Sequence, residues 1–286
     1  MTRHAGSPGG PPHRDHWSDH ARQWSFVRPP LRPCAEDEAL VAAAIDGWRQ
    51  RSGRADATAV VMGVTPELCG ADIGVRGRAI AVDNSLDMIG AIWPGRVRPS
   101  DEVVCADWRH MPLAADSVDL VLFDGGLSIL DYPDGYIGVG TDLGALLRRD
   151  GRCVVRCFAQ IERREPLGDV LEDLAKGRVR NVPILKWRLA MALQESAEAG
   201  VAVGDVWSAL QGAWPDLDRL AEHAGWPVEE VRTIEAYRGI ATRYTFPTLS
   251  EYRAVFEASG FDVVDVATPG YELGERCPTV VLEPRA

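Results

Sequence analysis

The stretch ADWRHMPLAADSVDLVLFD, residues 106–124, decides the fold. It starts where one short apolar run ends (DEVVCAD, residues 101–107) and closes inside another (VDLVLFDGG, residues 118–126). Both runs are rich in β-branched residues and nearly continuous in apolar character, which is typical of strands buried on both faces of a parallel sheet. Asp107 and Asp124 would therefore end two strands at one carboxyl edge, where ligands bind in open α/β folds.

The same pattern extends in both directions along the chain. Similar apolar runs occupy residues 59–62, 79–83 and 151–159, and helical segments lie between the runs, as at 85–93 and 141–149. Strands that alternate with helices indicate βαβ units and a doubly wound parallel sheet.

The pattern resumes near the C-terminus with a helix at 249–260 and strands at 261–268 and 278–284. The connection between these two strands is too short for a helical crossover, so we expect them to pair antiparallel. The predicted fold is α/β: a doubly wound, Rossmann-like seven-stranded sheet whose last strand is antiparallel, with a helical insertion after strand five.

This pattern divides the chain into five parts. We expect a disordered tail at 1–14, a helical N-terminal lid at 15–50, the Rossmann-like core at 51–159, a helical cap without a convincing strand at 160–245, and the C-terminal part of the core sheet at 246–286. Aromatic residues in the cap have the spacing of helix-core positions, although a minority could line an apolar substrate cavity or a dimer interface.

The composition excludes several partners. The 286 residues include 31 Lys+Arg and 42 Asp+Glu, and this net charge of −11 disfavours nucleic acid as the main partner. No apolar stretch is long enough to cross a membrane, and the N-terminus lacks the apolar segment of a signal peptide. We therefore expect a cytoplasmic protein with a small-molecule substrate and no membrane partner, and a homodimer is left open.

The strand ends carry a pattern that suits a nucleoside. Gly63 follows the first strand, and Asp83 ends the second strand 20 positions later, which is the separation expected for a carboxylate that holds ribose hydroxyls. An acidic residue also ends many purely structural strands, so this pair alone decides nothing. Asp107 at the third strand could accept the amine of an adenine, and Trp108 could cover its ring.

These residues resemble the class I S-adenosylmethionine-dependent methyltransferases over about 55–160 and 245–284. The resemblance is carried by four stretches: AVDNS (81–85), residues 106–124, LRRDGRCVV (147–155) and EASGFDVVDV (257–266). It implies S-adenosyl-L-methionine as cofactor, with Asp83 on the ribose hydroxyls, Asp107 on the adenine amino group and Trp108 at the adenine ring edge. Two further contacts are expected from Asn84 and Asp124.

The loop after the first strand departs from that family. Its members show an acidic residue two positions before a G-x-G-x-G loop, whereas this chain has Val61, Gly63, Thr65 and Glu67 at the corresponding positions. The cofactor has no phosphate, and its cationic amine and sulfonium favour acidic neighbours. Thr65 could supply a hydroxyl and Glu67 a carboxylate toward the methionine amine.

The N-terminal segment could close over the cofactor. Arg28 or Arg32 could pair with the methionine carboxylate, although solvated arginines on a docked helix explain the sequence equally well. His16 and His20 are four residues apart but have no third ligand nearby, so we expect no metal site.

Methyl transfer depends mainly on in-line positioning of the acceptor, and no catalytic residue is evident from the sequence. His110 and Tyr136 are weak candidates, since a surface-loop histidine and a tyrosine packed in a turn explain them equally well. We expect the substrate pocket to include Asp124, Tyr136 and Arg156.

The predicted function is thus methyl transfer from S-adenosylmethionine to a small molecule by in-line displacement, with the acceptor atom undetermined. One alternative is a non-catalytic S-adenosylmethionine-binding sensor or partner subunit. A second is an NAD(P)-dependent oxidoreductase, which should carry G-x-G-x-x-G after its first strand, whereas Gly63 is followed by VTPEL.

Overall fold

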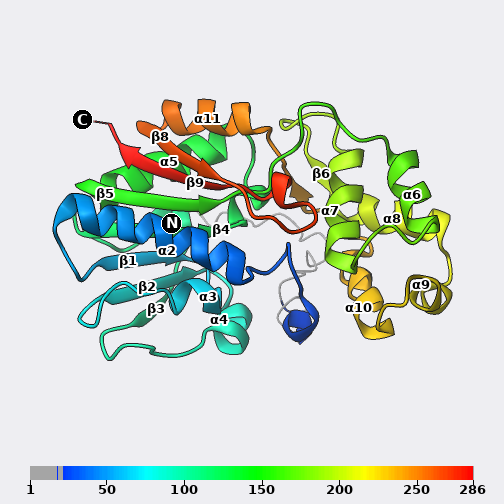
Figure 1. Ribbon diagram of the computed structural model, residues 1–286, viewed down its shortest axis with the longest axis horizontal. Helices are drawn as coiled ribbons and strands as arrows, with labels where there is room; N and C mark the ends of the chain where they lie inside the picture. The colour runs from blue at the N-terminus through cyan, green and yellow to red at the C-terminus, as the bar shows by residue number, and fades with distance from the viewer. Residues whose placement is uncertain (1–17, 19–21, 286) are drawn as a thin grey trace, which may run out of the picture.

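The computed structural model describes Ser18 and residues 22–285, and a seven-stranded sheet lies at its centre (Figure 1). The strand order is β3-β2-β1-β4-β5-β9-β8, in which β1 to β5 are parallel and β9 runs antiparallel to both β5 and β8. The predicted fold class is confirmed. The strands are β1 (Thr58–Met62), β2 (Arg78–Asp83), β3 (Glu102–Cys105), β4 (Val118–Asp124), β5 (Leu147–Arg156), β8 (Phe261–Ala267) and β9 (Thr279–Pro284).

Helices cover both faces of this sheet, as the continuous apolar strands predict. Val60 and Met62 of β1 belong to the core shared with α5 (Asp134–Leu146) and α11 (Leu249–Ala258). The intervening Val61 belongs to the opposite core, which is shared with three other helices: α2 (Ala35–Ser52), α3 (Pro66–Cys69) and α4 (Leu86–Ile92). Successive side chains of one strand therefore enter two different cores, which explains why no polar alternation is seen.

Helix α2 has clear start and stop signals. The backbone N–H of Cys34 donates to the Asp37 carboxylate at 2.9 Å, which closes a capping box at the first turn. The helix ends at Gly53, whose φ of +68° is the left-handed conformation that glycine adopts without strain.

The boundary between α5 and β5 and the content of the cap differ from the sequence prediction. The helix expected at 141–149 ends at Leu146, and β5 begins at Leu147, because Leu147 pairs with Val118 before a bulge shifts the register. The cap also contains two strands that the sequence did not predict, β6 (Val201–Ala202) and β7 (Arg243–Tyr244), which pair antiparallel. Two residues are too few to show any periodicity.

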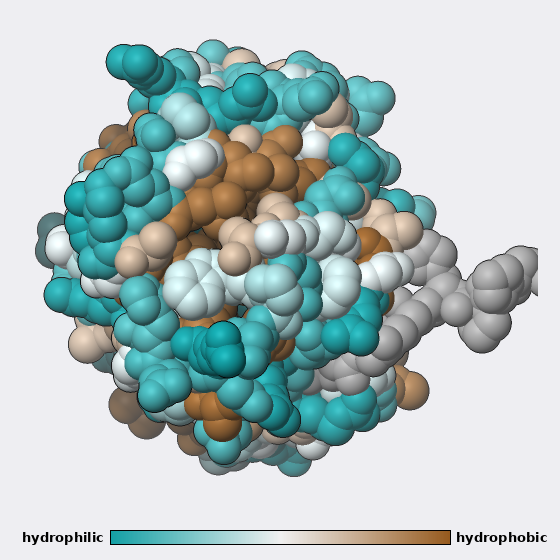
Figure 2. All heavy atoms as spheres, turned by 90° about the vertical axis from the view of Figure 1, so that its right-hand side faces the viewer, coloured by the Kyte–Doolittle hydropathy of each residue, from teal (hydrophilic) through white to brown (hydrophobic). Residues whose placement is uncertain are grey.

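The cap forms a second body of helices at one end of the molecule (Figure 1). Helix α7 (Val182–Leu193) is its centre, since every residue from Val182 to Ala192 is buried, as expected of a helix surrounded by others. Viewed toward this end, the surface shows an apolar area bordered by hydrophilic residues (Figure 2). The other cap helices are α6 (Leu167–Ala175), α8 (Val203–Ala213), α9 (Leu217–Ala224), α10 (Val228–Arg232) and η4 (Thr233–Tyr237).

Four short 3₁₀ turns complete the fold: η1 (Trp24–Phe26), η2 (Trp108–His110), η3 (Gly126–Ile129) and η5 (Gly274–Arg276). Three of them matter for the site, because η1 belongs to the N-terminal segment, η2 follows β3 and η3 follows β4. No helix within the described part of the chain has the length and apolar character needed to cross a membrane.

Candidate functional site

A cavity lies where the carboxyl ends of β1, β2 and β4 face the cap. It contains about 890 Å³ of space free of protein atoms, part of which is open to solvent. The loops after β1 and β4 both line it, and these strands are neighbours at the point where the strand order reverses, the usual ligand position in such sheets. Six of the predicted site residues line this cavity: Gly63, Thr65, Asp83, Asn84, Trp108 and Asp124.

The turn after β1 forms one wall. Gly63 has φ +92°, and its N–H donates to the Val82 carbonyl at 2.7 Å, so the chain leaves β1 in a conformation that favours glycine. Thr65 follows as the residue before α3, with Pro66 at the first helical position. The short helix thus replaces a longer glycine loop and leaves Thr65 on the cavity wall.

Asp83 is a buried carboxylate with capacity left for a ligand. It is 8% exposed, and one of its oxygens accepts the Ser85 N–H at 2.8 Å. Burial raises the pKa of this carboxyl, and in the part of the chain described no basic side chain forms an ion pair with it. A second carboxylate oxygen is therefore available for hydroxyl groups of a bound molecule.

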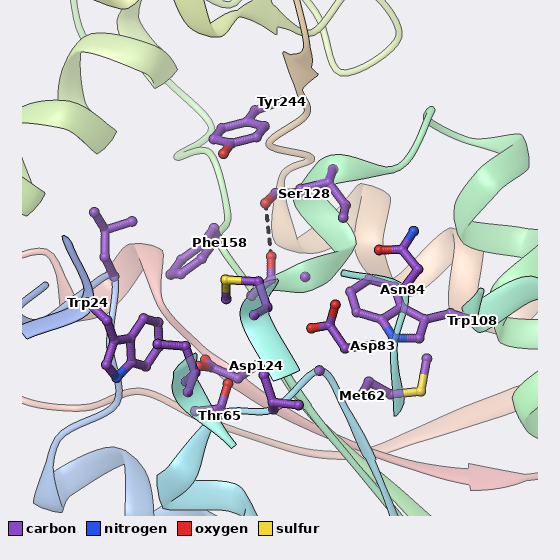
Figure 3. Close-up of a pocket in the computed structure, with 18 of the residues that line it drawn as sticks. Trp24, Met62, Thr65, Asp83, Asn84, Trp108, Asp124, Ser128, Phe158 and Tyr244 are labelled. Carbon is purple, nitrogen blue, oxygen red and sulfur yellow. Dashed lines mark hydrogen bonds between the residues drawn. The ribbon is translucent and has the colours of Figure 1, made fainter. Parts of the chain in front are cut away.

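Trp108 provides a flat surface near Asp83. Its indole N–H donates to the Val82 carbonyl at 2.7 Å, and its ring meets Phe123 edge to face, with centroids 4.9 Å apart. These contacts fix the orientation of the indole. Figure 3 shows Asp83, Asn84 and Trp108 around one part of the cavity, as a ribose and an attached base would require.

The turn after β4 consists of two glycines that approach aromatic rings closely. Gly125 has φ +64°, and a β-carbon there would lie 2.2 Å from Cε2 of Phe158. A β-carbon at Gly126 would lie 2.4 Å from Cε2 of Phe123 and 2.8 Å from the Trp108 ring. Any larger residue would displace a ring that borders the cavity or supports its wall.

Asp124 lines the cavity and is paired with Arg156 beneath it. The Arg156 guanidinium donates from Nε to Asp124 at 2.5 Å and from one terminal nitrogen to the Pro30 carbonyl at 2.8 Å. Arg156 is 3% exposed, and the Asp37 carboxylate lies 3.8 Å from the same terminal nitrogen. The predicted placement of Arg156 in the substrate pocket is therefore corrected: this side chain neutralises Asp124 and does not line the cavity.

The N-terminal segment lies between the core and the cap. Arg32 pairs with Glu67 of α3 at 2.6 Å, and Arg28 pairs with Glu230 of α10 at 3.2 Å. The Asn181 side-chain amide donates to the Pro29 carbonyl at 3.1 Å, which ties the segment to the start of α7. Both arginines are thus engaged with carboxylates of the protein, whereas Trp24 and Leu31 line the cavity.

Four predicted contacts lie elsewhere. Glu67 is turned toward Arg32 by the α3 helix, and Asp107 is held by Arg109 two residues later, at 2.9 and 2.5 Å. That guanidinium lowers the pKa of Asp107 to about 2. His110 is exposed at the end of η2, and Tyr136 is buried in the core, where its hydroxyl bonds Thr245 at 2.7 Å. None of the four side chains lines the cavity.

The cavity also has walls that the sequence did not assign to particular residues, although it left open that a minority of the cap's aromatic residues could line an apolar cavity. On the cap side these are Phe158 after β5, Trp187 on α7, Tyr237 on η4 and Tyr244 on β7. Helical spacing in the cap indicated apolar packing but could not separate residues that face a cavity from those that face another helix. The remaining unpredicted residues of the wall include Met62, Met88, Ile92, Ser128 and Ile129.

No metal centre is found in the region that the structure describes, because nowhere in it do three His, Cys, Asp or Glu side chains converge. The histidine pair His16 and His20 lies outside the described residues.

The strand order, with an antiparallel final strand, is that of the Rossmann-like methyltransferase fold, and solved S-adenosylmethionine-dependent methyltransferases share this fold. One such solved structure is a Burkholderia thailandensis 1,6-didemethyltoxoflavin-N1-methyltransferase with 1,6-didemethyltoxoflavin and S-adenosylhomocysteine bound. It is 16% identical with a TM-score of 0.51, and the match covers 99% of this chain and 94% of that one. A Haloferax volcanii methyltransferase solved with the Trm112 activator is 13% identical, with a TM-score of 0.51 and coverage of 96% and 99%.

A third match is a Rhodobacter sphaeroides protein described as a candidate zinc-dependent alcohol dehydrogenase. It is 12% identical with a TM-score of 0.59, and the match covers 95% of this chain and 100% of that one. Identities this low establish the fold and nothing finer. No family model matches the sequence, and no curated protein matches it.

Proposed function

We propose that the protein is an S-adenosylmethionine-dependent methyltransferase that acts on a small-molecule acceptor by in-line displacement. The observation that carries this proposal is the buried Asp83 carboxylate, with an oxygen left for ribose hydroxyls, beside the fixed indole of Trp108. It is supported by the fold, which a methyltransferase with bound S-adenosylhomocysteine shares.

The residues along the cavity fit the parts of this cofactor in order. Asp83 would accept hydrogen bonds from the ribose, and Asn84 with Trp108 would border the adenine. Thr65 and Asp124 lie farther along the same wall, where the methionine part would pass. The turn at Gly63 has room for a close approach, since a β-carbon there would meet nothing nearer than an Asp83 oxygen at 3.9 Å.

When bound, the cofactor supplies a methyl group activated by the sulfonium, and the protein's task is to position the acceptor and exclude water. The cap and the N-terminal segment ahead of α2 would do this, with residues 160–245 as an acceptor-binding cap. The lid expected over 15–50 cannot include α2, because that helix packs on the sheet as part of the core. No histidine or lysine of the described chain lines the cavity, and Asp124 is neutralised by Arg156. Transfer would therefore rely on positioning and on the acceptor's own nucleophilicity.

Two competing functions make different predictions. A non-catalytic sensor would bind the cofactor but transfer no methyl group, and the lack of a histidine or lysine on the described cavity wall favours this function over the oxidoreductase. An NAD(P)-dependent oxidoreductase would need a glycine loop for pyrophosphate, where this chain places Thr65 and a proline-started helix. The match to the Rhodobacter sphaeroides protein does not support the oxidoreductase function, because it shows a shared fold alone.

The test is calorimetric titration with S-adenosylhomocysteine, using Asp83→Ala and Asp107→Ala as a matched pair. A hydrogen bond to a charged group contributes about 1.5–3 kcal/mol, so we expect Asp83→Ala to weaken binding by about 10- to 150-fold. Asp107→Ala should change it by less than about threefold, since its carboxylate is already held by Arg109.

Equal affinity of the parent and the Asp83 variant would remove the ribose assignment. Binding of NAD(P) with no binding of S-adenosylhomocysteine would overturn the cofactor class. If the cofactor binds, transfer of a labelled methyl group to candidate small molecules separates the enzyme from the sensor.

A further inference from the structure

The chain passes from the core to the cap and back at two places that lie side by side. One follows β5 near Gln160, and the other precedes α11 near Thr248; these two residues form an isolated parallel bridge. The Gln160 N–H also donates to the Pro247 carbonyl at 3.0 Å. The cap is therefore joined covalently to the core along one side only, and two adjacent connections of this kind allow a hinge motion.

Helix α7 runs across the cap from these connections to the strap that faces them. At its C-terminal end, the Gln194 side chain donates to the Phe246 carbonyl at 2.8 Å and accepts the Phe246 N–H at 2.7 Å. At its N-terminal end, the Asn181 side chain caps the helix and donates to the Pro29 carbonyl at 3.1 Å. The 12 residues of α7 separate these ends by about 18 Å, and Trp187 between them lines the cavity.

The strap, which we define as residues 24–33 of the N-terminal segment, bounds the cavity at the start of α7. Leu31 lines the cavity and packs against the hydrophobic cluster of the cap. Its neighbour Pro30 accepts a hydrogen bond from Arg156 of the core at 2.8 Å, and Arg28 pairs with Glu230 of α10 at 3.2 Å. The strap thus reaches from the core to the cap, and Figure 1 shows it in dark blue between the core and α10.

The contacts that join the cap to the core differ in strength between the two sides. The Arg28 side chain is 58% exposed in its pair with Glu230, and exposed ion pairs contribute little to stability. After the first connection, Glu165 pairs with Arg188 of α7 at 2.5 Å and with Arg276 of η5 at 3.0 Å, and these three side chains are at most 16% exposed. Separating buried partners costs more, because the charges would be left unpaired in a medium of low polarity. The cap should therefore part from the core on the side of the strap.

We propose that the strap gates the cavity. When it releases the cap at Arg28 and Asn181, the cap turns about the paired connections, and ligands enter or leave past Leu31. The inference rests on the proposed function only for the identity of the ligand, S-adenosylmethionine. Arg28 and Asn181 are positioning residues, since neither lines the cavity and both act by holding the strap across it.

The double variant Arg28→Met/Asn181→Asp loosens the strap at both points. Aspartate caps a helix as well as asparagine does, so α7 keeps its first turn, but aspartate has no N–H to donate to Pro29. Arg285→Met/Asp216→Asn is the matched control. It removes an exposed ion pair of the core and exchanges the same two residue types at the cap of α9, away from the strap.

Hydrogen exchange, followed by mass spectrometry on the full chain without ligand, measures release of the strap. The amides of Val27 and Arg32 are bonded within the strap and should exchange about 5- to 50-fold faster in the double variant. The amides of Thr245 and Phe246, beside the connections, should stay within about twofold of the parent, because the hinge remains paired. The control should match the parent at both places.

Either of two exchange results would overturn the inference. The first is an unchanged rate in the strap of the double variant. The second is equal acceleration at the strap and beside the connections, since this would mean that the variant loosens the whole cap.

Stopped-flow mixing with S-adenosylhomocysteine separates a gate from a fixed wall, with the tryptophans that line the cavity as reporters. A gate predicts that the association and dissociation rate constants both rise by about 5- to 50-fold in the double variant, because the ligand passes only through the open form. A fixed wall predicts faster dissociation with unchanged association, and that result would also overturn the inference.

Failure of the proposed function gives a different result. If S-adenosylhomocysteine does not bind the parent, the proposed cofactor is wrong, and hydrogen exchange on the ligand-free chain still decides whether the strap is a gate. If S-adenosylhomocysteine binds and the double variant matches the control in both experiments, the gate alone is removed.

Discussion

The buried pair beneath the cavity offers a quantitative test of how the core, the lid and the site are held together. Replacing Arg156 with Met removes the guanidinium that binds Asp124 at 2.5 Å and the Pro30 carbonyl at 2.8 Å. Both charged side chains are almost fully buried, at 3% and 6% exposed. Breaking a buried ion pair by removing one partner costs about 3–5 kcal/mol, because the remaining charge stays unpaired in a medium of low polarity.

The free energy of unfolding, measured by urea titration at pH 7, should therefore fall by about 3–5 kcal/mol in Arg156→Met. The double variant Arg156→Met/Asp124→Asn removes both charges and should be more stable than Arg156→Met alone. Arg232→Met is the surface control: its ion pair with Asp218 is exposed on both sides and should contribute less than about 1 kcal/mol.

Two results would refute this reasoning. The first is an Arg156→Met variant that loses no more stability than Arg232→Met. The second is a double variant whose loss equals the sum of the losses in Arg156→Met and in Asp124→Asn, each measured alone, since additivity would mean that Asp124 and Arg156 do not stabilise each other.

Two further predictions concern stability. Gly125→Ala should lower the free energy of unfolding in urea titrations by about 1–3 kcal/mol, because Gly125 has a positive φ and its new β-carbon would meet Phe158. Gly138→Ala, at an exposed and open position of α5, should raise the free energy of unfolding by about 0.5–1 kcal/mol. Equal effects of the two substitutions would contradict the steric argument. Burial lowers the pKa of Lys186 to about 7. Between that pH and about 10.4, the unfolded chain therefore binds a proton at Lys186 that the folded chain does not. As the pH rises through this window, the free energy of unfolding of the parent should increase relative to that of Lys186→Met by up to about 1.4 kcal/mol per pH unit. Parallel stability curves for the two proteins would show that Lys186 is protonated in the fold.

Much of the fold could be predicted from the sequence because each strand of the parallel sheet is buried on both faces. Runs such as 59–62 and 118–123 are largely apolar for that reason, and Asp83 is the acidic, still buried residue at which β2 ends. The boundary between α5 and β5 was harder to place, since the residues around Leu147 suit a helix locally and become a strand only through pairing with β4.

A site residue could be predicted from the sequence only where its position at the end of a strand is enough to bring it to the cavity. Asp83 and Trp108 follow strand ends, so their position depends little on neighbours. Asp107 also follows a strand, but Arg109 two residues later captures its carboxylate, a local competition that spacing does not reveal. The sequence left open that a minority of the cap's aromatic residues lines a cavity, but it could not single out Trp187 and Tyr237, because whether a buried aromatic residue faces a cavity depends on how the cap packs against the core.

The two glycines after β4 limit where substitutions can be made to change the acceptor preference of this protein. One approaches Phe158 on the cap side of the cavity, and the other approaches Trp108 on the side of Asp83, in adjacent positions of one turn. A side chain introduced at Gly125 would therefore displace the Phe158 ring, and one introduced at Gly126 would displace the Phe123 and Trp108 rings, so neither position can be changed without altering a ring that lines or supports the cavity. Altered acceptor preference would be sought more safely at Tyr237 or Tyr244, where a substitution changes the cap side of the cavity and leaves the wall around Asp83 and Trp108 intact.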